Sequence, residues 1–335
     1  MTEPQTQIKK VVTQLTSVLS TRNREIISRR FGLKTGQKET LESIGASYQI
    51  TRERVRQIEE ASLAQIRESL DGASQAGIQP FVTLTKSILE TQGGAVQEQE
   101  LFSRFSGSSK DTPVNAALIF VLTLSDAFHR SLEDDNFFTF WSTSKEQAGQ
   151  FRSRVATLVS DLGGKKRMMN ETEAPEAVRS YLAISKNIGK NVFGQIGLTK
   201  WPEIKPRGVR DKSYLVLKKE GTPKHFREIT QLINTAQFGS RKAHVQTVHN
   251  ELIKDSRFIL VGRGIYGLAE WGYEPGTVKE VIANLIRKEG PQRKEAIVAH
   301  VMSSRMVKPN TVVLGMQDKK LFIENDNGHI ALKEA

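Results

Sequence analysis

The strongest constraint on the fold is a helical pattern between residues 41 and 66 that breaks once, at a short turn. Side chains of one face recur at helical spacing before the break and again after it. Gln49 and Ile50 occupy the break, and Thr51 is a residue type that favours the N-cap of a helix. The pattern predicts a helix-turn-helix. The shared faces consist of Leu41, Ile44 and Tyr48 in the first helix and Val55, Ile58, Ser62 and Ile66 in the second.

The start of the second helix carries polar side chains that point away from this face. Such a helix can enter the major groove of DNA, where arginine bridges guanine acceptors, glutamine pairs with adenine and glutamate accepts from cytosine. Two simpler interpretations stay open. The charges can form a solvated face held by ion pairs, and the two helices can be an ordinary hairpin. The candidate DNA-binding residues are Arg52, Glu53, Arg54, Arg56 and Gln57.

Two strings in this region, REIISRRFGL from Arg24 and TLESIGASYQITRERVRQIEEASLAQIR from Thr40, resemble region 4 of the principal bacterial sigma factors. The resemblance covers residues 21–67. It implies that Arg52, Glu53 and Gln57 read the upstream promoter hexamer and that Arg54 and Arg56 contact DNA near it. It also implies docking on the flap of the RNA polymerase β subunit.

This region departs from the sigma pattern in three ways. Gln49 stands in the turn where the family usually has glycine. Ala61, Ala64 and Gln65 take places where the family has basic residues, so we expect weaker phosphate anchoring. The region also lies at the front of the sequence, and we find no aromatic-rich segment of the kind that melts a promoter. We therefore do not expect a complete initiation factor.

The charge of the chain favours a polyanionic partner. Its 335 residues carry a formal net charge of +12, and the sequence pI is about 9.7. Lysine and arginine gain affinity for nucleic acids by releasing counterions from phosphates. Residues 73–150 are an exception, with five lysines and arginines against nine aspartates and glutamates. We expect this acidic segment to contact protein rather than phosphate.

Other function classes lack the residues they need. Without cysteine, the chain has no disulfide, thiolate nucleophile or cysteine zinc site. His244 and His249 have no carboxylate at metal spacing, and no catalytic constellation appears. The string GRGIYG at Gly262–Gly267 lacks the following helix that a dinucleotide site requires. We expect a protein that is not an enzyme and needs no cofactor or metal.

The location expected from the sequence is the cytoplasm, in association with the nucleoid. The N-terminus has no signal-peptide pattern, and no apolar run approaches the roughly 18 residues of a membrane span. The partners we expect are double-stranded, promoter-like DNA and the RNA polymerase core through its β flap. We expect no membrane contact and no small-molecule substrate.

The rest of the sequence shows an internal repeat of about 60 residues, in which helices precede an alternating hairpin. The clearest copy, residues 211–271, resembles the HARE-type winged helix, which occurs in the RNA polymerase delta subunit, in chromatin proteins and beside DNA-modifying enzymes. We expect Ser240 to cap its third helix and Val245, Val248 and Leu252 to be buried. Its candidate DNA-binding residues are Arg241, Lys242, Gln246 and Arg263.

Two further copies are less regular. A faint copy at Phe81–Trp141 has an acidic hairpin tip at Glu133–Asp135. The final copy ends in a hairpin with Asn327-Gly328 at its turn. We expect weaker DNA binding by the final copy, because its third helix offers only Asn310, Thr311 and Asp318.

These observations predict a mainly α fold with small β-hairpins, built from tandem helix-turn-helix and winged-helix domains. The expected function is promoter recognition or regulation of transcription initiation with bacterial RNA polymerase. An adaptor that binds polymerase without reading bases and an accessory subunit of a DNA-modification system are the alternatives. The expected segments are a sigma-like domain at 1–72, an acidic winged-helix-like domain at 73–150, a basic helical connector at 151–210, a HARE-type winged helix at 211–275 and a second winged-helix-like domain at 276–335.

Overall fold

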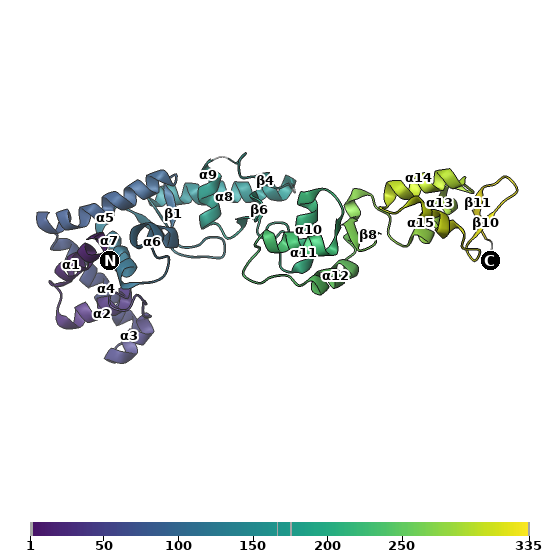
Figure 1. Ribbon diagram of the computed structural model, residues 1–335. Coiled ribbons are helices and arrows are strands. Elements are labelled where there is room, and N and C mark those ends of the chain that lie inside the picture. The colour runs from purple at the N-terminus through teal and green to yellow at the C-terminus, as the bar shows by residue number, and fades with distance from the viewer. Residues whose placement is uncertain (1–2, 166, 175, 334–335) are drawn as a thin grey trace. The chain divides into compact units, whose positions relative to one another are not determined.

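The computed structural model describes residues 3–165, 167–174 and 176–333, and the chain divides into two compact units. The first unit comprises residues 1–189 and 196–198, and the second comprises 190–195 and 199–335. Helices predominate and the strands form small sheets, which confirms the predicted fold class (Figure 1). No helix in the described ranges has the length and apolar character needed to span a lipid bilayer.

The first unit contains most of the long helices. Its helices are α1 (Glu3–Thr16), α2 (Thr21–Phe31), α3 (Leu41–Tyr48), α4 (Arg52–Glu68), α5 (Gly72–Thr91), α6 (Glu98–Ser106), α7 (Pro113–Ser125), α8 (Lys145–Lys165) and α9 (Glu176–Ile184). Its strands β1 (Ala95–Gln97), β2 (His129–Ser131) and β3 (Phe140–Ser142) form a sheet in the order β1-β3-β2. A second sheet has the order β4-β6-β5, from Met169–Asn170, Gln195–Leu198 and Ile188–Lys190.

Helix α7 forms the centre of the main core. Its sequence, PVNAALIFVLTLS, is apolar on every side, and a helix of that kind must be covered all round. It packs against α1, α2, α4, α5 and α6. Phe120 of α7 meets Phe31 of α2 edge to face, with ring centroids 5.1 Å apart. One continuous core therefore joins the sigma-like helices to the acidic segment that follows them.

The acidic segment also has a buried polar anchor. Glu98, at the start of α6, accepts hydrogen bonds from Nε and one terminal nitrogen of the Arg130 guanidinium group, at 2.5 and 2.7 Å. The same carboxylate accepts from the indole N–H of Trp141 at 3.0 Å. Strands β2 and β3 are thereby fixed to α6, and a carboxylate that costs energy to bury is satisfied by three donors.

The predicted acidic hairpin tip is partly neutralised in the structure. Glu133 forms an ion pair with Lys186 at 2.6 Å, and Asp134 forms one with Arg152 at 2.5 Å. Hydrogen bonds from Arg152 and from main-chain N–H groups hold the pKa of Asp134 below its usual value. Both cations come from beyond residue 150, so the charge count of residues 73–150 overstates the negative charge at the tip.

The second unit repeats one order of elements twice. The first series is α10 (Val209–Glu220), β7 (Lys224–His225), α11 (Phe226–Thr235), α12 (Val245–Lys254), β8 (Phe258–Gly262) and β9 (Ile265–Leu268), with sheet order β7-β9-β8. The second series is α13 (Val278–Glu289), α14 (Lys294–Ser304), α15 (Pro309–Met316), β10 (Phe322–Glu324) and β11 (Ile330–Leu332). A bridge between Gln292 and Ile330 takes the place of the missing short strand.

The predicted start of the third helix in the first series was wrong. Helix α12 begins at Val245 with His244 as its N-cap, so Ser240, Arg241 and Lys242 lie in the preceding loop. Asn234 explains the difference, because its side chain both donates to and accepts from the main chain of Ala243, at 3.2 and 2.7 Å. A capping-type residue in the sequence was overridden by this tertiary contact.

Two smaller predictions about third helices were also wrong. Val245, expected in the buried face, is 39% exposed, while Val248 and Leu252 are buried as predicted. Asp318 lies two residues beyond the end of α15 and is not part of that helix. Its carboxylate instead forms an ion pair with Lys279 of α13.

Arg305 joins the two series of the second unit. It is only 6% exposed, and its guanidinium donates to the carbonyl oxygens of Leu260, Glu274 and Gly276. The next residue, Met306, donates its N–H to Val261 O at 2.8 Å. The outer edge of β8 is therefore covered by the loop between α14 and α15. Burial lowers the pKa of Arg305, and the nearby carboxylates of Glu274 and Glu280 oppose this shift.

Candidate nucleic-acid interface

The helix-turn-helix is formed by α3 and α4, as the sequence predicted. Thr40 and Thr51 cap the two helices, and their hydroxyl groups accept from the N–H groups of Ser43 and Arg54, both at 3.1 Å. Ile26, Ile44 and Val55 are fully buried between α2, α3 and α4. This small core fixes the angle between the helices and leaves the first turn of α4 exposed.

The turn between the helices depends on Gly45. The N–H of Ile50 donates to Gly45 O at 3.0 Å, and a Cβ on Gly45 would lie 2.7 Å from Ile50 O. Gln49 adopts φ = 55°, in the left-handed region that favours glycine. The departure from glycine at this position therefore places a strained residue in the turn.

The outward face of α4 brings the predicted DNA-binding residues together. Arg52 forms an ion pair with Glu42 of α3 at 3.0 Å, with both side chains more than half exposed. Arg56 forms ion pairs with Glu53 at 2.7 Å and with Glu60. Arg54 donates to Gln57 Oε1 at 3.1 Å. All five candidate residues are exposed, and each has a partner on the protein surface.

These contacts make the face nearly neutral in its present state. Hydrogen bonds from Arg56 lower the pKa of the Glu53 carboxyl, and Glu53 together with Glu60 raises the pKa of Arg56. Exposed ion pairs are weak because water screens them. The arginines can therefore exchange their carboxylate partners for phosphates or base edges.

Two arginines of α2 hold the helices behind this face in place through ion pairs and hydrogen bonds. This role was not predicted from the sequence. Arg29 donates to both carboxylate oxygens of Glu39, at 2.9 and 2.6 Å, and lies over the ring of Tyr48. Arg30 pairs with Glu59 of α4 at 2.9 Å and donates to Glu39 O. The adjacent arginines of the string SRRF were the available signal, because neighbouring cations in a half-buried helix need partners.

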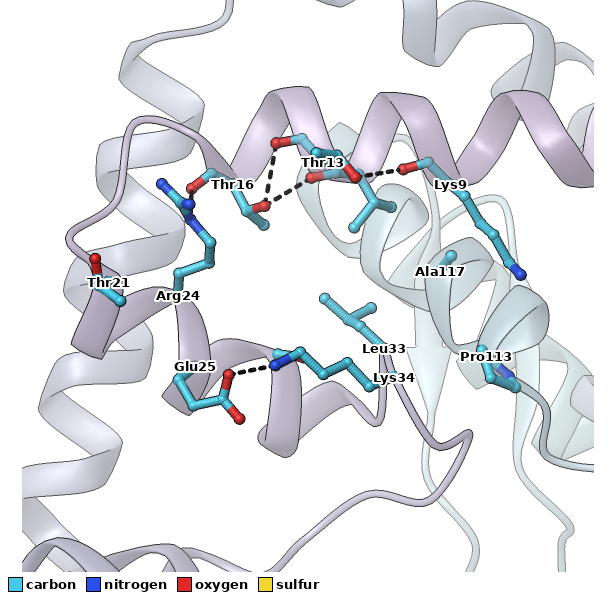
Figure 2. Close-up of a pocket in the computed structure, with 12 residues that line it drawn as sticks. Lys9, Thr13, Thr16, Thr21, Arg24, Glu25, Leu33, Lys34, Pro113 and Ala117 are labelled. Atoms are coloured by element: carbon cyan, nitrogen blue, oxygen red, sulfur yellow. Dashed lines mark hydrogen bonds and ion pairs between the residues drawn. The ribbon is translucent and has the colours of Figure 1, made fainter.

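Other cations near α2 hold helix ends in place. A hollow of about 540 Å³ is lined by residues of α1, α2 and the start of α7. Figure 2 shows these residues. Arg24 donates to three carbonyl oxygens at the end of α1, those of Thr16, Ser17 and Leu19, at 2.9 to 3.0 Å. Lys34 pairs with Glu25 at 2.6 Å. We therefore do not include this hollow in the interface.

The candidates in the second unit are dispersed. Arg241 and Lys242 are exposed in the loop before α12, and Gln246 is exposed in its first turn, where it donates to Asn250 at 3.0 Å. Arg263 is exposed at the turn between β8 and β9. Within the described ranges no hydrogen bond or ion pair joins these four residues. Arg241, Lys242 and Arg263 are cationic and Gln246 is neutral, and the four residues are not joined into one site.

The glycines around Arg263 shape the turn rather than a nucleotide site. Gly264 adopts φ = +70°, and a Cβ there would lie 2.7 Å from His225 Nε2. A Cβ on Gly262 would lie 2.8 Å from Met306 O, in the loop that covers β8. The string ends inside strand β9, and only the three-residue 3-10 helix Ala269–Trp271 comes after it, where a dinucleotide site would need an α-helix.

Comparison with known proteins bears on the helix-turn-helix directly. Residues 17–68 match the family model "Sigma-70, region 4". Over 51 residues the chain is 47% identical to RNA polymerase sigma factor SigA1 of Synechococcus elongatus, covering 15% of this chain and 13% of that protein. It is 47% identical over 53 residues to sigma factor RpoS of Coxiella burnetii, covering 16% and 15%.

The similarity to these relatives covers this one module. Sigma factor SigA of Clostridium acetobutylicum is 37% identical over 60 residues, which cover 18% of this chain and 16% of that protein. The chain thus spans less than a fifth of the length of each of these relatives. The sigma-70 region 4 module is shown, and it is a DNA-binding type of domain without catalytic residues of its own.

Proposed function

We propose that the chain is a bacterial, non-enzymatic DNA-binding protein that acts in transcription initiation and recognises promoter-like duplex DNA through α4. The observation that carries the proposal is the position of Arg52, Glu53 and Gln57. They lie on the exposed start of the second helix of a sigma-70 region 4 module, where a major groove is reached.

In this proposal the roles on α4 differ. Arg52 and Gln57 read base edges, and Glu53 accepts from a cytosine amino group. Arg54 and Arg56 contact phosphates beside the hexamer and set the register. Phosphate contact is limited further along α4, because Ala61, Ala64 and Gln65 replace basic residues.

The second unit contributes sequence-independent affinity in this proposal. Residues 211–271 act as a HARE-type winged helix, in which Arg241, Lys242 and Arg263 contact phosphates and Gln246 approaches the duplex from the start of α12. The element order and the exposure of these cations support this assignment. RNA polymerase core is the second partner, reached through its β flap, and the protein works in the cytoplasm at the nucleoid.

One observation favours an alternative function. Every candidate arginine of α4 already has a partner on the protein. A face that is neutralised in this way suits an adaptor that holds polymerase and leaves bases unread. The two functions differ in salt dependence, since phosphate contacts weaken steeply with salt and an apolar protein contact does not.

Binding to promoter and scrambled duplexes tests the proposed function. We expect Arg52→Ala and Gln57→Ala each to lose about 1–3 kcal/mol of preference for the promoter duplex, the usual value of a bidentate base contact. Fluorescence anisotropy at one fixed salt concentration gives the ratio of the two affinities. Arg104→Ala is the control, because Arg104 forms a comparable exposed ion pair with Glu100 on α6.

The control should keep the wild-type affinity ratio. If Arg52→Ala and Gln57→Ala also keep it, α4 does not read bases. Binding of the full chain to core polymerase, measured in the same buffers, then decides whether the adaptor function replaces the proposed one.

A further inference from the structure

The end of the chain presents an apolar surface to solvent. On α15, Val313 and Leu314 are 38% and 66% exposed. On the hairpin that follows, Leu321 and Ile323 are 41% and 46% exposed. Scattered single apolar residues are normal on a protein surface, whereas a group of four from neighbouring elements marks a contact surface.

Two of these side chains, Val313 and Ile323, line a groove between α15 and β10. The groove has a volume of about 860 Å³, and Val313 and Met316 of α15 face Phe322 and Ile323 of β10 across it. Three lysines also line it, namely Lys294, Lys319 and Lys333. Its one acidic residue, Glu324, pairs with Lys294 at 2.9 Å. Lys319 and Lys333 form no ion pair with any described carboxylate, so the rim of the groove is positive.

The main chain along this groove is open. Lys333 N–H donates to Leu321 O and Asn325 N–H donates to His329 O, so residues 321, 323 and 325 face β11. Alternate residues of an antiparallel strand point the other way, which directs Phe322 O and both polar groups of Glu324 outward. An edge of this kind pairs readily with another extended segment.

In the first series of the same unit, an extended segment of the chain already covers the corresponding strand edge. Strand β8 lies at the outer position of its sheet, as β10 does beside β11. The edge of β8 is covered by an extended segment, whose Met306 N–H donates to Val261 O and whose Arg305 donates to Leu260 O. Strand β10 occupies the matching place in the second series and has no such cover among the described residues.

We propose that the groove between α15 and β10 docks an extended segment of a partner protein with alternating apolar and acidic side chains. The backbone of the segment adds to the edge of β10, its apolar side chains enter between Val313 and Ile323, and its carboxylates meet Lys319 and Lys333. A basic or phosphate-bearing ligand suits the groove less, because Val313 and Ile323, the exposed apolar side chains that line it, would remain uncovered. The inference stands independently of whether α4 reads DNA.

A labelled peptide tests this proposal on the full chain. The probe is a short fluorescent peptide of alternating leucine and glutamate, followed by anisotropy. We expect saturable binding that weakens roughly tenfold or more with Val313→Glu, a typical loss when a central apolar contact is removed. Lys319→Glu with Lys333→Glu should weaken it similarly at low salt and less at high salt.

Matched controls distinguish binding in the groove from non-specific binding to other exposed apolar or basic residues. Ile253→Glu changes another exposed apolar residue, 64% exposed on α12, and Lys288→Glu changes an exposed lysine outside the groove. Both should bind the peptide as the wild type does. The peptide with lysine in place of glutamate, and the acidic peptide with an N-methylated backbone, should bind at least about tenfold more weakly.

Several outcomes would overturn the inference. One is binding that the groove variants and the control variants change equally. Another is displacement of the peptide by duplex DNA in wild type and in Lys242→Glu with Arg263→Glu alike, which would assign the groove to nucleic acid. A third is concentration-dependent dimerisation in sedimentation that Val313→Glu abolishes, since a second copy would then be the occupant.

Discussion

Two arginines at matching places in the second unit have opposite environments. Arg241 lies three residues before the N-cap of α12, and Arg305 lies three residues before the N-cap of α15, each directly after a serine. Arg241 is exposed, while Arg305 is buried against three carbonyl oxygens. The arginine at this repeat position is thus a proposed DNA contact in the first series, as Arg241. In the second series, as Arg305, it holds the two series together.

Removing the buried arginine should separate the two series of the second unit. We expect Arg305→Ala to lower the free energy of unfolding of the last segment by about 1–3 kcal/mol or more, because buried carbonyl groups lose their donor. Urea unfolding of the full chain measures it. Limited proteolysis between Trp271 and Thr277 should also become faster.

The matched control is Arg293→Ala, since Arg293 is exposed at the start of α14 and its side chain forms no capping hydrogen bond. It should change stability by less than about 0.5 kcal/mol. Equal stability and equal rates of proteolysis for the two variants would mean that Arg305 does not stabilise the junction between the two series.

The turn between α3 and α4 tolerates no side chain at Gly45. We expect Gly45→Ala to destabilise the protein by about 1–3 kcal/mol, because its Cβ would meet a main-chain oxygen that the turn itself fixes. Binding to promoter duplex should weaken as well. Chemical denaturation and anisotropy measure the two effects.

Gly149 in α8 provides the control for that substitution. It lies in the interior of an exposed helical turn, and a Cβ there would meet no atom within 4 Å. Gly149→Ala should therefore leave stability unchanged or raise it by up to about 1 kcal/mol. A Gly45→Ala protein as stable as Gly149→Ala would show that the turn can shift.

The elements that the sequence predicted well are those fixed by local chemistry. The caps Thr40 and Thr51 act within four residues, and the face of Val55, Ser62 and Ile66 follows from helical spacing alone. The start of α12 was mispredicted because Asn234, which binds the main chain of Ala243 and precedes Val245 by eleven residues, decides it. Likewise the partners of Arg29 and Arg30 depend on which helices meet, which no spacing along the chain reveals.

Whole-molecule contacts were the least predictable. The sequence of α7 is apolar on every side, but it does not say which surfaces will cover the helix. The sheet β4-β6-β5 lies within residues 151–210, where we expected a basic helical connector, and it was not predicted because its strands are short and interrupted by glycine and polar residues.

We expect the second unit to supply much of the salt-dependent affinity of the full chain for duplex DNA. Lys242→Glu with Arg263→Glu in the full chain should weaken binding to promoter and scrambled duplexes alike. The slope of log affinity against log salt should fall by about 2, roughly one for each lost phosphate contact. A series of anisotropy titrations at increasing salt gives this slope.

Lys308→Glu is the matched control, since Lys308 is the exposed N-cap of α15 in the series expected to bind DNA weakly. It should leave the slope nearly unchanged. A larger loss from Lys308→Glu than from the double variant would reverse the expected ranking of the two series.

The central place of α7 also has a consequence for how the protein is made. A ribosome adds about 5–20 residues per second, so α7 emerges several seconds after α4. During that interval the small core of Ile26, Ile44 and Val55 can close, while Ile27, Phe31 and Ile66 lack the helix that covers them. The outward face of the nascent helix-turn-helix is therefore folded while the apolar residues on its opposite side are still exposed. We expect a chaperone that binds apolar surface to bind the chain most strongly until Ser125 has been synthesised.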